Sequence, residues 1–170
     1  MRPLDGSDAA LYCQLYTTAE LMRFIAPPLS MEAAQRSFEV ALRNQSPRPQ
    51  RWIIHGKQGG AAIGLLGLIG SGDRPEIGVM LVAPAHGRGI GSEAMQGMAD
   101  HAFSAFGLQS ICARQSVVDN PAVIRMMTRL GYTALPPTPE RPQGGEWELP
   151  RSRWRAPEPG PAMAEAAASG

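Results

Sequence analysis

The spacing of apolar residues predicts two helices in the first quarter of the chain. Apolar positions near helical spacing favour a helix over Leu11 to Ile25, which Pro27 and Pro28 end. Ser30 can cap a second helix that runs to about Asn44. We expect its buried face to consist of Ala34, Phe38, Ala41 and Leu42.

The middle of the chain carries three strand-like runs in quick succession. They are Arg51 to His55, Ala62 to Ile69 and Glu76 to Val82. The links between them, Lys57 to Gly60 and Gly70 to Pro75, are short and have the glycine and charged residues of turns. Connections this short favour an antiparallel meander.

Helical and strand-like segments then alternate. We expect a helix over Ile90 to Phe106, a strand over Ser110 to Val118 and a short helix over Pro121 to Leu130, which Gly131 ends. A last strand candidate is Gly145 to Leu149. This order predicts an α/β (α+β) fold in which helices flank a single sheet.

Composition refines this picture. The 170 residues include 19 Gly and 16 Pro, yet 44% are hydrophobic, which is enough for a core. Half of the prolines lie late in the chain, so we predict one domain over 1–154 and a disordered Pro- and Ala-rich tail over 155–170. Cys13 and Cys112 are expected to be reduced and buried.

Charge and hydropathy argue against several classes of partner. The net charge is +1 without a basic block, so we expect no nucleic-acid partner. The longest apolar stretch, Ala61 to Gly70, is too short to cross a bilayer, and the first ten residues lack the apolar core of a signal peptide. We therefore expect a cytoplasmic protein without a membrane partner.

The richest stretch for chemistry is a glycine-rich loop between a strand and a helix. Gly87, Gly89 and Gly91 lie where the helix begins, and Arg88 adds a positive charge. Glycine lets the backbone approach a ligand closely, and the free N–H groups of a helix N-terminus attract anions. The loop therefore predicts a phosphate site.

Two of the familiar phosphate loops fit poorly. A P-loop needs a Gly-Lys-Ser/Thr ending, and no lysine is present here. The residues from Gly89 to Ala94 fit a dinucleotide fingerprint, but they begin too far after the strand. An acid is expected about 20 residues on, but Asp119 lies 30 residues on, past the end of the next strand. A nucleotide-binding oxidoreductase is therefore the weakest alternative.

The loop resembles the coenzyme A loop of the GNAT superfamily of N-acetyltransferases. His86 to Gly91 matches that family's [RQ]-x-x-G-x-[GA] motif, except that His86 replaces Arg or Gln. Asn120 begins a segment ending in Gly131 and Tyr132 that resembles a second family pattern. The best likeness is to the ribosomal-protein N-terminal acetyltransferase branch.

The resemblance implies a fold, a cosubstrate and a set of binding residues. It implies a mixed, mostly antiparallel sheet that splays at the acetyl-CoA site, with pantetheine paired to a strand edge and a backbone N–H that polarises the thioester. No metal is implied, and no ligand cluster at zinc spacing is present. The implied coenzyme A residues are Met80, Leu81, Val82, Gly87, Arg88, Gly89, Ile90, Gly91, Ser92 and Asn120.

The catalytic groups are less clearly marked. The resemblance makes Glu76 the candidate base, and the alternative is an ion pair with Arg74 or Arg114. Positions where relatives hold a Tyr or Ser acid are Met127 and Val123 here, so either Tyr132 serves or the thiolate leaves unaided. Asn120 can bind pantetheine or only cap its helix.

The sequence leads us to expect an acetyl-CoA-dependent N-acetyltransferase acting on a primary amine. The acceptor is a small molecule or a peptide or protein N-terminus, and the residues do not identify it. The alternative is a non-catalytic acyl-CoA-binding or regulatory module. A short first strand near Met1 to Leu4 would leave a sheet edge exposed, which allows a homodimer.

Overall fold

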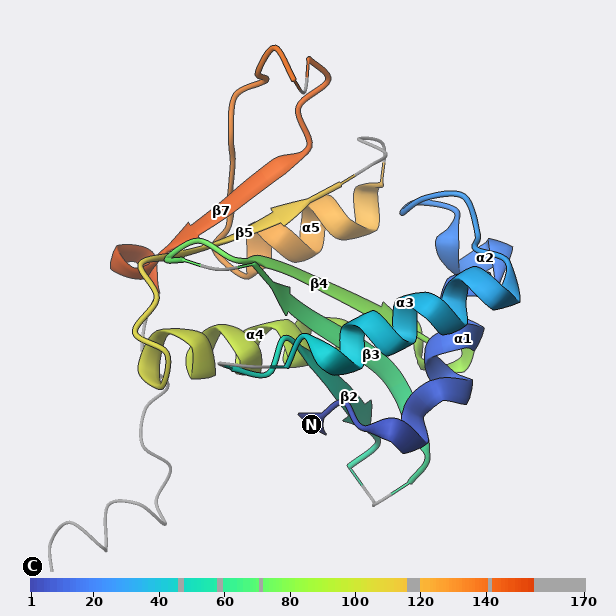
Figure 1. Ribbon diagram of the computed structural model, residues 1–170. Helices are drawn as coiled ribbons and strands as arrows, with labels where there is room; N and C mark the ends of the chain where they lie inside the picture. The colour runs from blue at the N-terminus through green and yellow to red at the C-terminus, as the bar shows by residue number, and fades with distance from the viewer. Residues whose placement is uncertain (46–47, 58–59, 71, 116–119, 141, 155–170) are drawn as a thin grey trace, which may run out of the picture.

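A seven-stranded sheet runs through the molecule, with strand order β1-β2-β3-β4-β5-β7-β6 (Figure 1). The computed structural model describes residues 1–45, 48–57, 60–70, 72–115, 120–140 and 142–154, so the predicted tail lies outside the described residues. All neighbouring strands are antiparallel except β4 and β5, which are parallel. The predicted mixed, mostly antiparallel α/β sheet is confirmed.

The predicted strands all form, most of them within a residue of the expected bounds. The meander β2-β3-β4 is antiparallel as expected, and β5 ends at Arg114, before residues 116–119, which are not described. The two-residue strands β1 and β6 are too short for a periodicity to predict them. The strands are β1 (Arg2–Pro3), β2 (Arg51–His55), β3 (Ala62–Ile69), β4 (Glu76–Leu81), β5 (Ser110–Arg114), β6 (Thr133–Ala134) and β7 (Glu146–Pro150).

The first predicted helix is wrong as a single element, because the chain breaks at Thr18. This residue is extended, with φ −80° and ψ 112°, and its hydroxyl donates to the carbonyl of Gln14. Threonine hydroxyls that bond back to the preceding turn compete with helix continuation. The helices are α1 (Ala9–Thr17), α2 (Ala19–Met22), α3 (Met31–Arg43), α4 (Ile90–Ser104) and α5 (Pro121–Arg129).

The predicted helix ends are confirmed at two places. The Ser30 hydroxyl accepts a hydrogen bond from the Ala33 N–H, 3.2 Å away, at the start of α3. Gly131 follows α5 with φ +83°, and the Tyr132 N–H donates to the Met127 carbonyl, the bond of a Schellman motif. The expected burial of Leu42 is wrong, since α3 turns this side chain to solvent, 37% exposed.

Two apolar cores lie on opposite faces of the sheet. The face formed by Ile53 and Leu65 packs against α1 and α3, which include Leu15 and Phe38. The other face packs against α4 and α5. Side chains alternate along a strand, so Glu76, Gly78 and Met80 of β4 lie on the α1/α3 face. Each face is therefore covered by its own helices.

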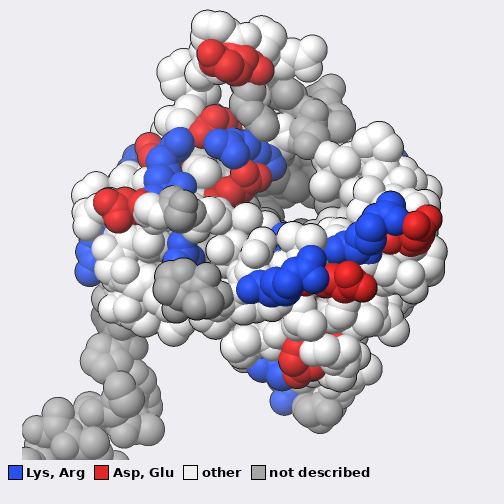
Figure 2. Space-filling view, viewed as in Figure 1, with Lys and Arg blue, Asp and Glu red and all other residues white. Residues whose placement is uncertain are grey.

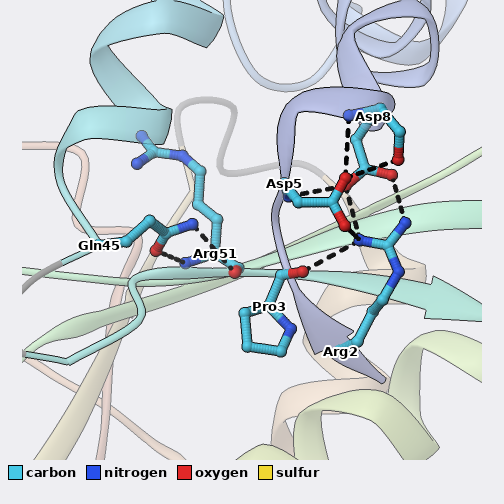
Figure 3. A network of polar contacts seen from close by, with 7 residues as sticks. Arg2, Pro3, Asp5, Asp8, Gln45 and Arg51 are labelled. Atoms are coloured by element: carbon cyan, nitrogen blue, oxygen red, sulfur yellow. Dashed lines mark hydrogen bonds and ion pairs between the residues drawn. The ribbon is translucent and has the colours of Figure 1, made fainter.

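The N-terminal strand β1 is fixed by a side-chain clasp. Arg2 forms two hydrogen bonds with the buried carboxylate of Asp8, at 2.8 and 2.7 Å, as Figure 3 shows. Asp8 also accepts from the Asp5 N–H. The clasp links β1 to the 3-10 helix Gly6–Asp8, and β1 itself pairs with β2 at the edge of the sheet. Among the described residues, no helix is both long enough and apolar enough to span a membrane.

Candidate active site

Strands β4 and β5 pair only where they begin. The single ladder pair joins Glu76 to Cys112, and the Cys112 N–H donates to the Pro75 carbonyl at 3.0 Å. Beyond this point the two strands diverge, and a gap opens in the middle of the sheet (Figure 1). Backbone groups on this edge of β4 therefore have no strand partner.

The register of β3 and β4 identifies which groups face the gap. The Val82 N–H donates to the Ile63 carbonyl at 3.0 Å, so the backbone N–H and C=O groups of Val82 point toward β3. Hydrogen-bonded and non-hydrogen-bonded residue pairs alternate along an antiparallel ladder, so the backbone N–H and C=O groups of Met80 also point toward β3. The N–H and C=O groups of Val79 and Leu81 therefore point into the gap.

His86 covers one of these groups. Its Nε2 lies 2.9 Å from the Leu81 carbonyl oxygen. A carbonyl can only accept, so Nε2 carries the hydrogen and donates. The groups left facing the gap are the Leu81 N–H and both backbone groups of Val79. The histidine that departs from the family motif thus fixes the end of β4.

The start of α4 presents unbonded N–H groups. Gly89 is its N-cap with φ +76°, a left-handed conformation that glycine adopts without strain, and it supplies no side-chain cap. The first intrahelical bond is Glu93 N–H to the Gly89 carbonyl. The N–H groups of Ile90, Gly91 and Ser92 therefore lack a helical acceptor, which makes this end an anion site.

A cavity of about 620 Å³ opens at this helix end, and we call it the phosphate cavity. Its lining holds three arginines that the sequence reasoning missed, Arg23, Arg125 and Arg129. The last of these also bonds the Ser92 hydroxyl. Only one carboxylate, Glu20, lines the same space among the described residues. The four-residue spacing of Arg125 and Arg129 on one helix is the signal that could have found them.

A second cavity of about 380 Å³ is lined by residues of both β4 and β5, and we call it the acceptor cavity. Its lining is mostly apolar or aromatic, with Tyr16 from α1, Arg51 from β2 and Arg114 from β5. The two cavities meet, because six residues line both. These shared residues are Leu21, Phe24, Val79, Asn120, Val123 and Met126.

Most of the predicted coenzyme A residues border one of the two cavities. Met80 lines the acceptor cavity, and Val82 and Arg88 line neither. Arg88 is exposed, and Val82 is partly buried against the α1/α3 core. Those that line the phosphate cavity are Leu81, Gly87, Gly89, Ile90, Gly91, Ser92 and Asn120.

Glu76 lines the acceptor cavity but is ion-paired. Its carboxylate lies 2.6 Å from Arg114 Nη1, and both side chains are 39% exposed. Of the two alternative partners, the structure selects Arg114, because Arg74 binds Glu146 and Glu148 instead. A proton taken up by Glu76 would weaken its ion pair, so the pair competes with a role as base.

Asn120 performs the capping role and still borders both cavities. Its Oδ1 accepts from the Val123 N–H at 3.3 Å at the start of α5. Capping uses the oxygen alone, and an asparagine amide also carries two N–H donors. The same side chain can therefore cap α5 and donate to a ligand.

The candidate acids divide between the cavities and the core. Val123 lines both cavities and Met127 lines the acceptor cavity, but neither carries a transferable proton. Tyr132 lines neither cavity, and its buried hydroxyl has no hydrogen-bond partner among the described residues. Burial raises its pKa above the ordinary phenol value. The arrangement favours a core role for Tyr132.

Tyr16 is the tyrosine that the acceptor cavity does contain. Burial raises its pKa to about 12, with a contribution from neighbouring Tyr12 and an opposing one from Arg51. It is therefore a neutral phenol near pH 7. Nothing local in the sequence marks it, because it joins the site through the packing of α1 over the sheet.

Comparisons with known proteins agree with this geometry. Residues 1–133 match the family model described as an acetyltransferase (GNAT) domain. No curated protein sequence matches the chain.

Two solved structures show the likeness in fold. An acetyltransferase from Agrobacterium tumefaciens has a TM-score of 0.73 and 23% identity over 87% of this chain and 88% of that one. Spermidine N-acetyltransferase from Vibrio cholerae in complex with CoA and spermine has a TM-score of 0.76 and 18% identity, over 89% of this chain and 95% of that one.

Proposed function

The chain belongs to the GNAT acetyltransferase family and is thus an acyltransferase, and from that premise we propose that it moves the acetyl group of acetyl-CoA to the nitrogen of a primary amine. The observation that carries this proposal is the gap between β4 and β5, where two cavities meet beside unpaired backbone groups. One cavity suits the phosphates of coenzyme A, and the other suits the amine.

The phosphate cavity fits coenzyme A in charge and in geometry. The free N–H groups at the start of α4 and three lining arginines would bind pyrophosphate. We propose that Arg88, an exposed residue between Gly87 and Gly89, adds a positive charge beside the phosphate cavity. The amide groups of pantetheine would pair with Val79 and Leu81 as an added strand, with Asn120 as a further donor.

The reaction needs no covalent intermediate on the protein. The amine nitrogen forms a bond to the acetyl carbon, the carbon–sulfur bond breaks, and the amine proton passes to a base while coenzyme A leaves as a thiolate. The Leu81 N–H points into the gap and would stabilise the oxyanion that develops on the thioester oxygen. A thiol pKa of about 8.5 allows departure without an acid.

We assign Glu76 as the base that takes the amine proton, directly or through water. A positioned general base contributes about 10²- to 10⁴-fold in rate. Glu76→Gln should therefore lower kcat by at least about 100-fold near pH 7 and recover as rising pH deprotonates the amine.

Arg114→Gln is the matched variant for this assignment, because it breaks the same ion pair and keeps the carboxylate. It should retain most of the activity. Equal losses in the two variants, with no recovery at high pH, would assign Glu76 to positioning alone.

A thiol-release assay tests the proposed function. We expect the protein to release free thiol from acetyl-CoA only when a suitable amine is added, with a product one acetyl group heavier. The panel should include peptides with free N-termini, because the ribosomal-protein N-terminal acetyltransferase branch is the likeness that the motifs favour. Small primary amines form its second half.

The second candidate is a non-catalytic acyl-CoA-binding module. It is favoured by Met127 and Val123, which replace the residues that serve as acids in relatives. Calorimetric titration with acetyl-CoA separates the outcomes when combined with the thiol assay. Binding without amine-stimulated release would select the module.

A further inference from the structure

The acceptor cavity carries one positive charge that nothing balances. Its charged lining residues are Arg51, Glu76 and Arg114. Glu76 and Arg114 neutralise each other across 2.6 Å. Among the described residues, no carboxylate lies within 4.0 Å of the Arg51 guanidinium, whereas Arg74 and Arg114 on the same sheet face each have two.

Nearby acids do not change this balance. Glu146 and Glu148 of β7 lie on the same sheet face, but they bind Arg74 at 2.9 and 2.8 Å and do not line the cavity. Figure 2 shows basic and acidic side chains interspersed over this view of the molecule. Within the acceptor cavity, the charge left unbalanced is therefore that of Arg51.

Arg51 lies in a row with two glycines across the sheet. It stands opposite Gly67 of β3, which stands opposite Gly78 of β4, so the three residues form one row across the α1/α3 face. A Cβ added at Gly78 would meet nothing within 4 Å. A Cβ at Gly67 would lie 3.1 Å from the Ile69 side chain, so Ile69 covers the middle of the row and the open position is Gly78, on the strand that borders the gap.

The protein holds Arg51 by its backbone and leaves a side-chain donor unpaired. Gln45 accepts from the Arg51 N–H at 3.3 Å and donates to the Arg51 carbonyl at 3.5 Å (Figure 3). Neighbouring Tyr16 is a neutral phenol and does not balance the charge. The Arg51 Nε is buried and has no acceptor among the described residues. The Arg51 side chain lines the cavity without a carboxylate partner, so a carboxylate on a ligand can supply one.

The rest of the cavity is apolar, which limits the kind of amine that fits. Leu21, Phe24, Met80 and Trp147 supply apolar and aromatic surface. A polyamine would need several free carboxylates, and the one present in the described lining is already paired. Guanidinium groups bind carboxylates through paired hydrogen bonds.

We propose that the acceptor is a primary amine that also carries a carboxylate on an apolar body. Arg51 binds the carboxylate while the amine lies at the gap between β4 and β5. This inference rests on the proposed acetyl transfer and names the substrate class for the same site. It differs from the spermidine named for the Vibrio cholerae structure.

Matched pairs of acceptors test the inference in the thiol-release assay. The pairs are L-phenylalanine with 2-phenylethylamine, and the dipeptide Phe-Glu amide with Phe-Gln amide, with spermidine as the polycation. We expect kcat/KM to be at least about 10-fold higher for the carboxylate member of a pair, because a charge-assisted hydrogen bond to Arg51 is available to that member alone. Spermidine should be the poorest acceptor.

Variants of Arg51 locate the preference. Arg51→Gln should lower kcat/KM for the carboxylate member alone, and Arg51→Lys, which keeps the charge, should retain part of the preference. Arg36→Gln removes an exposed arginine of α3 and should change nothing. Equal use of both members, a preference for spermidine, or equal losses in Arg51→Gln would overturn the inference and leave acetyl transfer standing. Failure of every amine would overturn both.

Discussion

At the scale of single residues, the environment of each tyrosine decides its role. Tyr132 and Tyr16 are both largely buried and both have a raised pKa, but only Tyr16 borders a cavity. Local sequence does not separate them, because burial depends on contacts made across the sheet. The same limit applies to Arg51, whose importance appears only when the fold places it in the lining of a cavity whose one carboxylate among the described residues is already paired.

Tyr132→Phe should leave acetyl transfer unchanged. The hydroxyl is buried without a partner among the described residues and lines neither cavity, so its removal relieves an unsatisfied group. We expect unchanged turnover and an equal or higher midpoint of thermal unfolding. A loss of most of the turnover, together with a lost alkaline limb in the pH profile, would instead identify Tyr132 as the acid.

Tyr16 should make the protein less stable in alkali. The unfolded phenol ionises near pH 10, while burial raises the pKa of the folded one to about 12. Over that interval the unfolded state binds fewer protons, so the free energy of unfolding falls as pH rises. Urea unfolding between about pH 9 and pH 11.5 measures this free energy. It should decline less steeply with pH for Tyr16→Phe than for the wild type, and parallel declines would refute this.

At the scale of elements, the best predicted features are those set by local chemistry. The bounds of β2 and β3 follow from apolar runs between glycine turns, and the start of α4 follows from Gly87, Gly89 and Gly91. The splay of β4 from β5 came from the family resemblance. The register of β4 with its neighbouring strands could not be predicted, because pairing between distant segments leaves no local signal in the sequence.

The first predicted helix, which breaks at Thr18, shows the opposite case. Apolar spacing alone favoured one continuous helix, but two threonine hydroxyls bond back to the carbonyls of Cys13 and Gln14. After this break, Leu21 of α2 and Phe24 of the turn that follows line both cavities. The spacing of apolar residues carries no information about such competition from side-chain hydroxyls.

Gly91→Asp separates phosphate binding from folding. Gly91 lies in the first turn of α4, where a carboxylate stabilises the helix dipole, and a Cβ there would make ordinary contacts at 3.7 Å with Leu81 and Val79. The variant should fold but bind coenzyme A at least about 100-fold more weakly, an electrostatic cost of about 2.7 kcal/mol.

Gly91→Ala is the matched control, because it adds the same Cβ without the charge. It should bind coenzyme A within a few-fold of the wild type in calorimetric titration. Wild-type affinity in Gly91→Asp would remove the start of α4 from the site. Equal losses in both variants would point to steric blocking instead of charge.

At the scale of the whole molecule, the two helical layers meet different needs. Helices α4 and α5 supply much of the phosphate cavity, and the acceptor cavity is lined by the strands together with side chains of both helical layers, such as Tyr16 of α1 and Met127 of α5. The sheet joins them at its gap. The predicted cytoplasmic location and homodimer remain predictions, and the short edge strand β1 is the place where a dimer would form.

The clasp at β1 should contribute to global stability. Asp8→Asn leaves Arg2 without its buried carboxylate, and we expect a loss of about 2 kcal/mol. For a chain of this size that lowers the unfolding midpoint by about 4 to 8 °C. Asp73→Asn, at an exposed aspartate, is the control, and equal midpoints for the two variants would show that the clasp contributes nothing measurable.

Amide hydrogen exchange along β4 tests most directly whether the gap binds acetyl-CoA as an added strand. Without ligand, Met80 and Val82 should be protected by β3, while Val79 and Leu81 should exchange quickly because their N–H groups point into the gap. Saturating acetyl-CoA should slow Val79 and Leu81 by at least about 10-fold and leave Met80 and Val82 little changed. Unchanged exchange at Val79 and Leu81 in the saturated protein would contradict the account.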